Sequence, residues 1–100
     1  MKNFRTYQLA IQFYRDCQNI KLTRIARDQF ERALLSIPLN LAEGAAKPTE
    51  RDRKKFYFIA LGSMREVQAL LTLFGSPELN SKADRLAASL YCLCYPNRHR

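Results

Sequence analysis

Residues 50–74 read ERDRKKFYFIALGSMREVQALLTLF, and this stretch decides the fold class. Its small and apolar residues recur at alternating steps of four and three, which is the spacing of one face of an α-helix. They are Phe56, Ala60, Ser63, Val67, Leu70 and Phe74. Thr49 and Asp52 stand in the positions of a capping box, and Gly75 is a natural helix stop. We therefore predict one long helix from about residue 50 to residue 74.

Three further helices are predicted around this one by the same periodicity. They cover about residues 5–19, about residues 23–45, and the segment from Pro77 to just before Pro96. Thr23 is a suitable N-cap for the second helix, and Ser76 followed by Pro77 is the order expected at a helix start. Because Pro38 lies inside the second segment, that segment is expected either to kink or to form two helices that meet at Pro38.

The composition favours a single all-α domain. The chain has 100 residues, of which 47% are hydrophobic, and this is the size and balance of one globular domain. Its 3 glycines and 4 prolines are too few for the many tight turns of a β-sandwich or barrel. Because short connections bring consecutive helices back alongside one another, we predict an antiparallel up-down four-helix bundle over residues 1–100.

The loop between the two long central helices predicts their register. Antiparallel pairing about this loop places Ser36 near Gly62 and Asn40 near Phe58. The small residues Ser36, Gly62 and Ser63 are then expected to let the two backbones approach closely. Asn40 falls in a core stripe, where a buried amide needs partners, and we interpret it as a lock on the register rather than a ligand contact.

Two ion pairs are also expected from this register. They are Glu43–Lys55 and Arg32–Glu66. By this register Glu43 and Glu66 lie several helical turns apart along the bundle axis, so they are too distant for shared acid–base chemistry.

The apolar content of the third helix exceeds what one stripe needs. From Phe56 to Leu61 the helix is apolar all the way round, whereas each helix of a four-helix bundle has an outer face. A central position in its own bundle is the alternative explanation. Because large exposed apolar patches are rare on monomers, we expect several copies of the chain to assemble.

The sequence favours a cytoplasmic location. Arg15 and Asp16 interrupt the N-terminal region too early for a signal peptide, and no stretch reaches the roughly 20 apolar residues of a membrane span. The 3 cysteines are an odd number, which favours a reducing compartment over a disulfide framework.

No catalytic or metal-binding pattern is recognisable. Cys92 and Cys94 are two residues apart on a helix, so they point away from each other and cannot chelate together. Ser63 has no nearby base, because His99 in the C-terminal tail is the only histidine. Phosphate-binding glycine loops and hydrolase motifs are absent from the sequence. We therefore expect no enzyme activity, no metal and no cofactor.

The charge is the most informative property for function. The formal net charge is +8, and the basic residues gather in two groups. One group is Lys47, Arg51, Arg53, Lys54 and Lys55, and the other is Lys21, Arg24 and Arg27. Such surfaces bind phosphate backbones without reading sequence, although a merely solvated face is about as common an explanation. Whether the tail residues Arg98 and Arg100 lie beside Arg5 or at the opposite end is left open by the sequence.

Two motifs resemble a known family. They are Ser36-Ile37-Pro38-Leu39-Asn40-Leu41-Ala42-Glu43-Gly44 and the segment from Phe56 to Glu66, which contains Ala60-Leu61-Gly62-Ser63. Together with Tyr7-Gln8-Leu9-Ala10, they are similar to the bacterial four helix bundle proteins encoded by intervening sequences of 23S rRNA genes. The resemblance covers about residues 4–93. The family is related to the accessory protein of diversity-generating retroelements, a pentameric barrel of bundles that binds nucleic acid and a reverse transcriptase.

The resemblance implies a homopentameric ring with a basic surface for nucleic acid and no catalysis. It implies structural roles for the matched residues Ser36, Pro38, Asn40, Glu43, Gly44, Gly62, Ser63 and Glu66. The favoured hypothesis is a non-enzymatic, oligomeric accessory protein that binds structured RNA or RNA/DNA and assists a reverse transcriptase. The alternative is a protein-interaction scaffold with no direct role in nucleic-acid binding.

Overall fold

The computed structural model of the chain describes residues 4–98, and over this range it contains helices and no strand. The helices are α1 (Phe4–Asp16), α2 (Arg24–Ala45), α3 (Glu50–Phe74) and α4 (Pro77–Cys94), followed by the short 3-10 helix η1 (Pro96–Arg98). The predicted all-α class and all four helices are confirmed. α1 ends at Asp16, earlier than predicted, and Pro96–Arg98 is helical where a loose tail was expected. His99 and Arg100 lie outside the described residues.

Three of the helices begin at the caps that the sequence predicts. The hydroxyls of Thr23, Thr49 and Ser76 each accept a hydrogen bond of 3.2 Å from the backbone N–H three residues further on. Each bond satisfies one of the donors left without a partner in the first helical turn. α2 continues through Pro38 as one helix, so the alternative of two helices meeting there is wrong.

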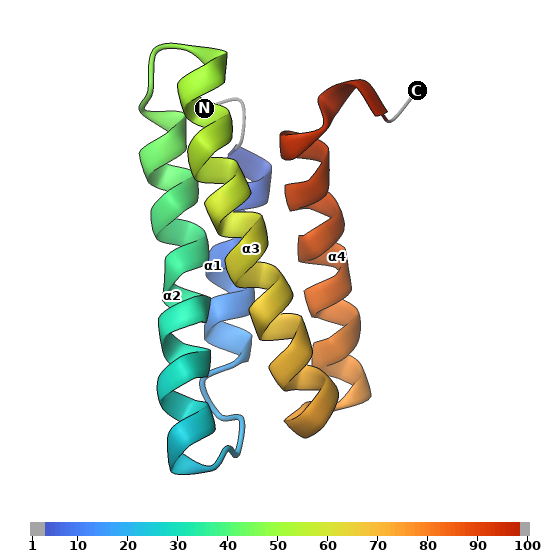
Figure 1. The fold of residues 1–100 in the computed structure, drawn as a ribbon. Coiled ribbons are helices and arrows are strands. Elements are labelled where there is room, and N and C mark those ends of the chain that lie inside the picture. Colours follow the sequence, from blue (N-terminus) through green and yellow to red (C-terminus); the bar gives the residue numbers. More distant parts are fainter. Residues whose placement is uncertain (1–3, 99–100) are drawn as a thin grey trace.

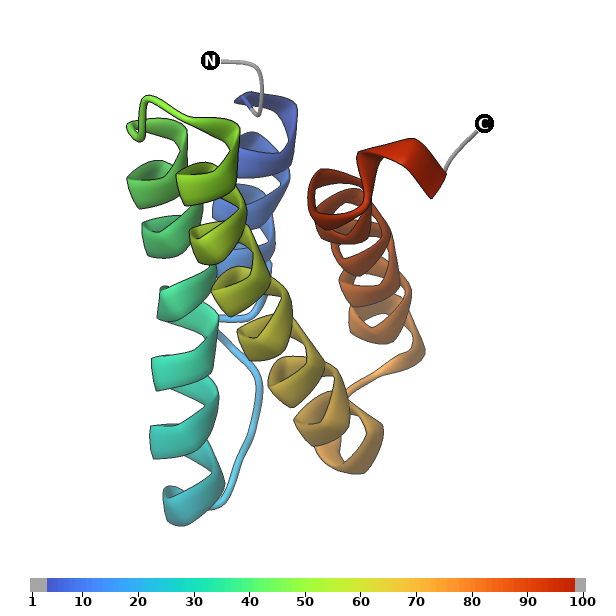
Figure 2. The ribbon, with the colours of Figure 1, turned by 45° about the horizontal axis from the view of Figure 1, so that its top comes forward.

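The four helices form an antiparallel up-down bundle (Figure 1). α1 packs against α2 and α4, and α3 packs against the same two helices, so each helix has two neighbours. This topology brings the start of α1, the α2–α3 loop and the end of α4 to one end of the bundle (Figures 1 and 2). We call this the loop end. The other end, which holds the α1–α2 and α3–α4 connections, is the far end.

The core consists of the apolar stripes expected from the helical period. Its largest fully buried side chains are Phe30, Leu34, Ile37, Leu41, Met64, Val67, Leu71, Leu86, Leu90 and Cys94. α1 adds Ala10 and Phe13 to the same cluster, and Cys17, directly after α1, joins them. Burying a large apolar side chain contributes about 1.5–3 kcal/mol, so these stripes supply most of the driving force for folding.

A polar seam fixes the register of α2 against α3. Ser63 Oγ donates to Ser36 Oγ across the two helices at 2.7 Å. Asn40 Nδ2 donates to the same hydroxyl oxygen at 3.0 Å and to the Ser36 carbonyl at 2.9 Å. Asn40 therefore has partners, as expected, but it reaches α3 only through Ser36. The seam is half-buried, and it aligns the helices because only one register lets the two serines meet.

The closest approach of α2 and α3 occurs at a different glycine from the one predicted. Gly62 is exposed, and a Cβ placed on it would have nothing within 4 Å, so the prediction that it permits close packing is wrong. Gly44 is buried, and a Cβ there would lie 2.7 Å from Tyr57 Cε1 and 3.0 Å from Phe56 Cβ. Phe58 does not face Asn40, since its ring packs against Tyr95 of α4.

The two predicted ion pairs between α2 and α3 do not form within the described part of the chain. Glu43 instead pairs with Lys47 at 3.1 Å, four residues further along. Neighbours four residues apart share one helix face and reach each other without ordering a second element, so the local pair is the less costly one. Arg32 and Glu66 are both exposed.

Several large apolar side chains remain at the surface of α2 and α3. They are Ile25 (79% exposed), Leu35 (46%), Leu39 (59%), Phe58 (42%), Ile59 (51%), Leu73 (73%) and Phe74 (39%). This is the apolar surplus that the sequence indicated, and it extends beyond α3 onto α2. Among residues 4–98, every helix is too short or too polar to cross a membrane.

Candidate nucleic-acid interface

Basic side chains gather at the loop end of the bundle. Arg5 lies in the first turn of α1, Lys47 follows α2, and four more belong to the first two turns of α3. These four are Arg51, Arg53, Lys54 and Lys55. Pro48 and the capping residue Thr49 turn the chain here, so residues on both sides of the turn share one end (Figure 1). We call the six residues the basic end.

Three of these six cations are held by neighbouring groups. Lys47 pairs with Glu43, and its ammonium lies 5.2 Å from the centre of the Phe56 ring. Lys54 and Glu50 are 3.8 Å apart. Arg53 Nη1 donates to the Lys47 carbonyl at 3.0 Å, which closes the loop. These contacts order the α2–α3 turn and leave most of each charge near the surface.

The other three cations are exposed and available to an anion. Within the described chain Arg5, Arg51 and Lys55 take part in no ion pair. The acidic residues nearby are Glu43, Glu50 and Asp52, so positive charge exceeds negative charge at this end. A surface of this kind attracts a polyanion through long-range potential and pairs with phosphates singly.

The second predicted group lies at the far end of the bundle. Lys21 and Arg24 stand at the start of α2, and α2 spans 22 residues, or about 33 Å, before it reaches Lys47. Arg27 is already engaged, since it donates to the Ile20 carbonyl at 3.1 Å and lies 3.8 Å from Glu31. Arg24 and Arg27 therefore cannot share one phosphate with the basic end.

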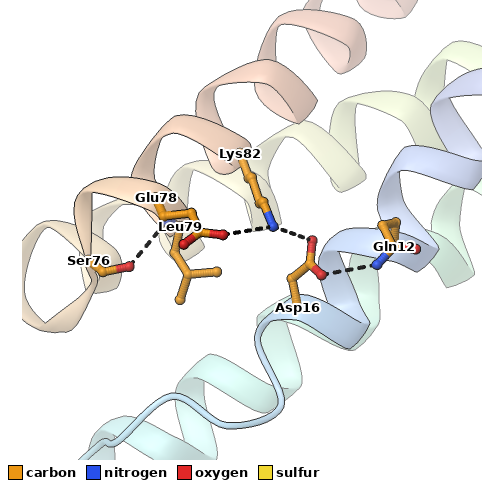
Figure 3. A network of polar contacts seen from close by, with 6 residues as sticks. All are labelled: Gln12, Asp16, Ser76, Glu78, Leu79 and Lys82. Atoms are coloured by element: carbon orange, nitrogen blue, oxygen red, sulfur yellow. Dashed lines mark hydrogen bonds and ion pairs between the residues drawn. The ribbon is translucent and has the colours of Figure 1, made fainter.

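One ion pair at the far end joins two helices. Lys82 of α4 lies 3.3 Å from Asp16 of α1 and 3.3 Å from Glu78 of its own helix (Figure 3). Gln12 Nε2 donates to the same Asp16 carboxylate at 3.0 Å. Hydrogen bonds to Asp16 and then to Glu78 raise the pKa of Lys82 above its ordinary value. The network ties α1 to α4, and its carboxylates would repel an approaching phosphate.

The residues of the two sequence motifs divide into an inner and an outer set. Pro38 and Gly44 are buried, and Ser36, Asn40 and Ser63 form the half-buried seam. Glu43, Gly62 and Glu66 are exposed. The motifs therefore supply the α2–α3 contact together with part of its outer surface.

An aromatic cluster at the loop end was not predicted. The Phe58 ring meets Tyr95 edge to face, with centroids 5.3 Å apart and planes at 85°. Tyr91 lies one turn before Tyr95, with ring centroids 4.7 Å apart. The apolar run around Phe58 and the tyrosines near the end of α4 were the available signals. Their meeting depends on how α3 and α4 pack, which the helical spacing alone does not state.

The three cysteines occupy different environments. Cys92 is exposed and Cys94 is buried, which confirms that the two point to different sides of α4. Burial raises the pKa of Cys94 to about 11, an effect that nearby Lys54 partly offsets. Burial, reinforced by Asp16 and opposed by Lys82, raises the pKa of Cys17 to about 12. Among residues 4–98 no three His, Cys, Asp or Glu side chains lie together as metal ligands would.

The fold and the charge distribution define a small basic protein built as a four-helix bundle, with six basic residues gathered at the loop end. Residues 2–93 match the model of the 23S rRNA-intervening sequence protein family, and the chain belongs to this family. The family resemblance carried by the two motifs is thereby confirmed. Comparison with curated proteins returned no match.

Proposed function

We propose that this protein is a non-enzymatic, oligomeric accessory protein that binds structured RNA or RNA/DNA through its basic end. The observation that carries the proposal is the set of exposed cations Arg5, Arg51 and Lys55, which α1 and α3 bring to one end. Lys47, Arg53 and Lys54 add positive charge beside them. Contacts of this type read the shape and charge of a backbone rather than its sequence.

We also propose that copies of the chain assemble, as a homopentamer, and so repeat the basic end around a ring. Leu35 and Leu39 lie one turn apart on α2, and both are exposed. Covering these side chains against another copy would remove apolar surface from water. Repetition of the basic end would multiply the local potential. The buried, reduced thiols Cys17 and Cys94 favour a cytoplasmic setting.

The proposed nucleic-acid contact is tested by binding of a short RNA duplex at several salt concentrations. Affinity is expected to fall steeply between about 50 and 200 mM salt, because each phosphate contact releases counterions. The double variant Arg51→Glu/Lys55→Glu should weaken binding at least about tenfold and lower the salt slope by about 0.9 for each contact removed. Lys21→Glu/Arg24→Glu is the matched control, since it makes the same charge change at the far end.

Equal weakening by the two double variants would mean that net charge, rather than the basic end, governs binding. Absence of duplex binding at low salt would remove the nucleic-acid function and favour the scaffold. The scaffold alternative rests on the exposed apolar side chains of α2 and α3, which could hold a partner enzyme such as a reverse transcriptase. It predicts capture of a protein partner that persists at high salt.

Assembly is tested separately by light scattering. A pentamer has five times the 11.7 kDa mass of one chain. Leu39→Glu should reduce the mass to that of one chain, because it places a carboxylate in the proposed contact. Glu31→Gln, an exposed change elsewhere on α2, should leave the mass unchanged. A single-chain mass for the unmodified protein would contradict the proposed assembly.

A further inference from the structure

We propose that the groove between α3 and α4, together with the exposed ring of Phe58 near its aromatic end, binds an unpaired base of single-stranded nucleic acid by stacking on Phe58. Tyr91 and Arg65 line the groove, and the ring of Tyr95 connects Tyr91 to Phe58. Lys54 lies one turn before Phe58 on α3. This inference rests on the proposed function, because the basic end would bring the strand to the groove. It adds an unstacked base as a second kind of ligand, beside the phosphates that the basic end would bind.

The Phe58 ring is held in place and is open to solvent. Its contact with Tyr95 fixes one side of the ring, and 42% of the residue is exposed. Gly62 lies one turn further along the same side of α3, and space for a Cβ there is empty to 4 Å. A side chain at this position would cover the flank of Phe58. The absence of one leaves room for a planar group beside the ring.

The groove runs along α4 from Tyr91, which the ring of Tyr95 connects to Phe58. It has a volume of about 480 Å³ and is lined by Arg65 and Gln68 of α3 and by Ala87, Ala88, Tyr91 and Cys92 of α4, together with Asp84. The alanines keep its floor shallow and apolar. Pockets of about 300–1,000 Å³ hold small organic ligands, so a base is well within its capacity.

The cations around the groove are placed for phosphates on either side of a stacked base. Lys54 precedes Phe58 by one turn of α3, and Arg65 follows it by two turns. Lys54 lies near α4 as well, since its charge acts on the thiol of Cys94. Arg65 is exposed and donates to Gln68 Oε1 at 2.9 Å, which orients its guanidinium along the groove.

Among the described residues, Asp84 is the one carboxylate that lines the groove, and it makes the two ends of the groove electrostatically different. Asp84 accepts a hydrogen bond of 3.0 Å from Gln68 Nε2, so its charge lies at the end remote from Lys54. Phosphates are therefore disfavoured beside Asp84 and favoured toward Lys54. A purely apolar protein segment would leave Arg65 without a counter-charge and Lys54 with only its exposed pair to Glu50, whereas a nucleic-acid strand supplies both a stacking face and phosphates.

The experiment compares binding of oligouridine with binding of the same short RNA duplex. Phe58→Leu keeps an apolar side chain against Tyr95 and removes the π face. It should weaken oligouridine binding about tenfold, because one stacked base contributes this much or more, and should leave duplex binding unchanged. Ile59→Ala is the control, since Ile59 is a similarly exposed apolar residue one position along. Arg65→Gln should lower the salt slope for oligouridine by about 0.7.

A spectroscopic readout reports the groove directly. The chain has 5 tyrosines and no tryptophan, so its fluorescence comes from tyrosine alone. Stacking of uracil in the groove should quench part of this emission, and Phe58→Leu should abolish the quenching. Equal oligouridine affinity for Phe58→Leu and Ile59→Ala would overturn the proposal. A change of molecular mass in Phe58→Leu would also overturn it, because the face would then join copies of the chain.

These outcomes are separable from failure of the proposed function. If duplex binding is intact and salt-dependent but no stacking on Phe58 is detected, only the groove proposal is refuted. Failure of the unmodified protein to bind either RNA refutes both proposals together.

Discussion

The two ends of the bundle carry similar residues and use them differently. At the far end Lys82 lies between Asp16 and Glu78, and Arg27 is held by Glu31 and the Ile20 carbonyl. At the loop end, cations outnumber acids and three of them are exposed without an ion pair in the described chain. The far end thus uses part of its charge to join helices, although Lys21 and Arg24 are exposed there without an ion pair in the described chain, whereas at the basic end no ion pair joins two helices.

This difference follows from where the chain places its carboxylates. Asp16 of α1 reaches Lys82 of α4, so this pair crosses the bundle, whereas Glu78 pairs with Lys82 within α4. At the loop end Glu43 pairs with Lys47 and Glu50 pairs with Lys54, in each case four residues further along the chain. Exposed pairs of that kind contribute little to stability. The basic end therefore depends on backbone packing for its shape, and the variants below test this dependence.

The largest effect is expected at the glycine that closes the basic end. Gly44→Val would place side-chain atoms where a Cβ alone lies 2.7 Å from buried Tyr57, so the bundle should lose about 1–3 kcal/mol or more. Gly62→Ala is the control, because its Cβ enters open space and alanine favours a helix by up to about 1 kcal/mol. Thermal unfolding should show a lower Tm for the first variant and an equal or higher Tm for the second. Equal melting of both variants would show that the α2–α3 contact at Gly44 is loose.

A smaller effect is expected at the seam midway between the ends. Ser36→Ala removes the oxygen that accepts from both Ser63 and Asn40. The free energy of unfolding should fall by about 1–3 kcal/mol, since two donors lose a partner. Ser81→Ala, an exposed serine of α4, should change it by less than about 0.5 kcal/mol. Urea denaturation measures both, and a similar result for the two serines would refute the role of the seam.

Alkaline pH distinguishes the two buried thiols. The folded protein raises the pKa of Cys94 to about 11 and of Cys17 to about 12, from an ordinary 9.0. Because burial favours the neutral thiols, they contribute fully to the free energy of unfolding below pH 9.0. This contribution is lost as the pH rises through 11 and 12 and the thiols ionise. Between these limits iodoacetamide should modify exposed Cys92 first, then Cys94 beside Lys54, and Cys17 last. Modification of Cys17 before Cys94 would contradict the higher pKa assigned to Cys17.

The smallest effect is expected from the ion pairs of the far end. Lys82→Met should lower the Tm slightly, because the contacts of Lys82 are partly solvated, and it should leave RNA affinity unchanged. Lys55→Met is the matched change at the basic end, where RNA affinity should fall and the Tm should stay the same. Equal losses of RNA affinity in the two variants would erase the functional distinction between the ends.

Local structure was the part that sequence could predict. Helix bounds, the caps Thr23, Thr49 and Ser76, and the buried stripes depend on residues within a few turns of one another. The up-down topology also determines that the end of α4 lies beside the start of α1, although the sequence interpretation left this open. Family membership agreed with the motifs because these motifs encode the α2–α3 contact.

Contacts between helices were predicted less well. Pairing Ser36 with Gly62 missed the actual meeting with Ser63, since a shift of one residue along α3 turns a side chain by about 100°. The ion pair predicted for Glu43 failed because Glu43 pairs locally with Lys47. Phe58 and Tyr95 meet through the packing of α3 on α4, so helical spacing gave no indication of the aromatic cluster.

The central claim is that nucleic acid contacts the basic end and not the far end. Lysine acetylation of the unmodified protein, with and without RNA, tests it at both ends at once by mass spectrometry. RNA should protect Lys54 and Lys55 several-fold and leave the modification of Lys21 and Lys82 unchanged. Equal protection at both ends, or protection confined to Lys21 and Lys82, would contradict this account.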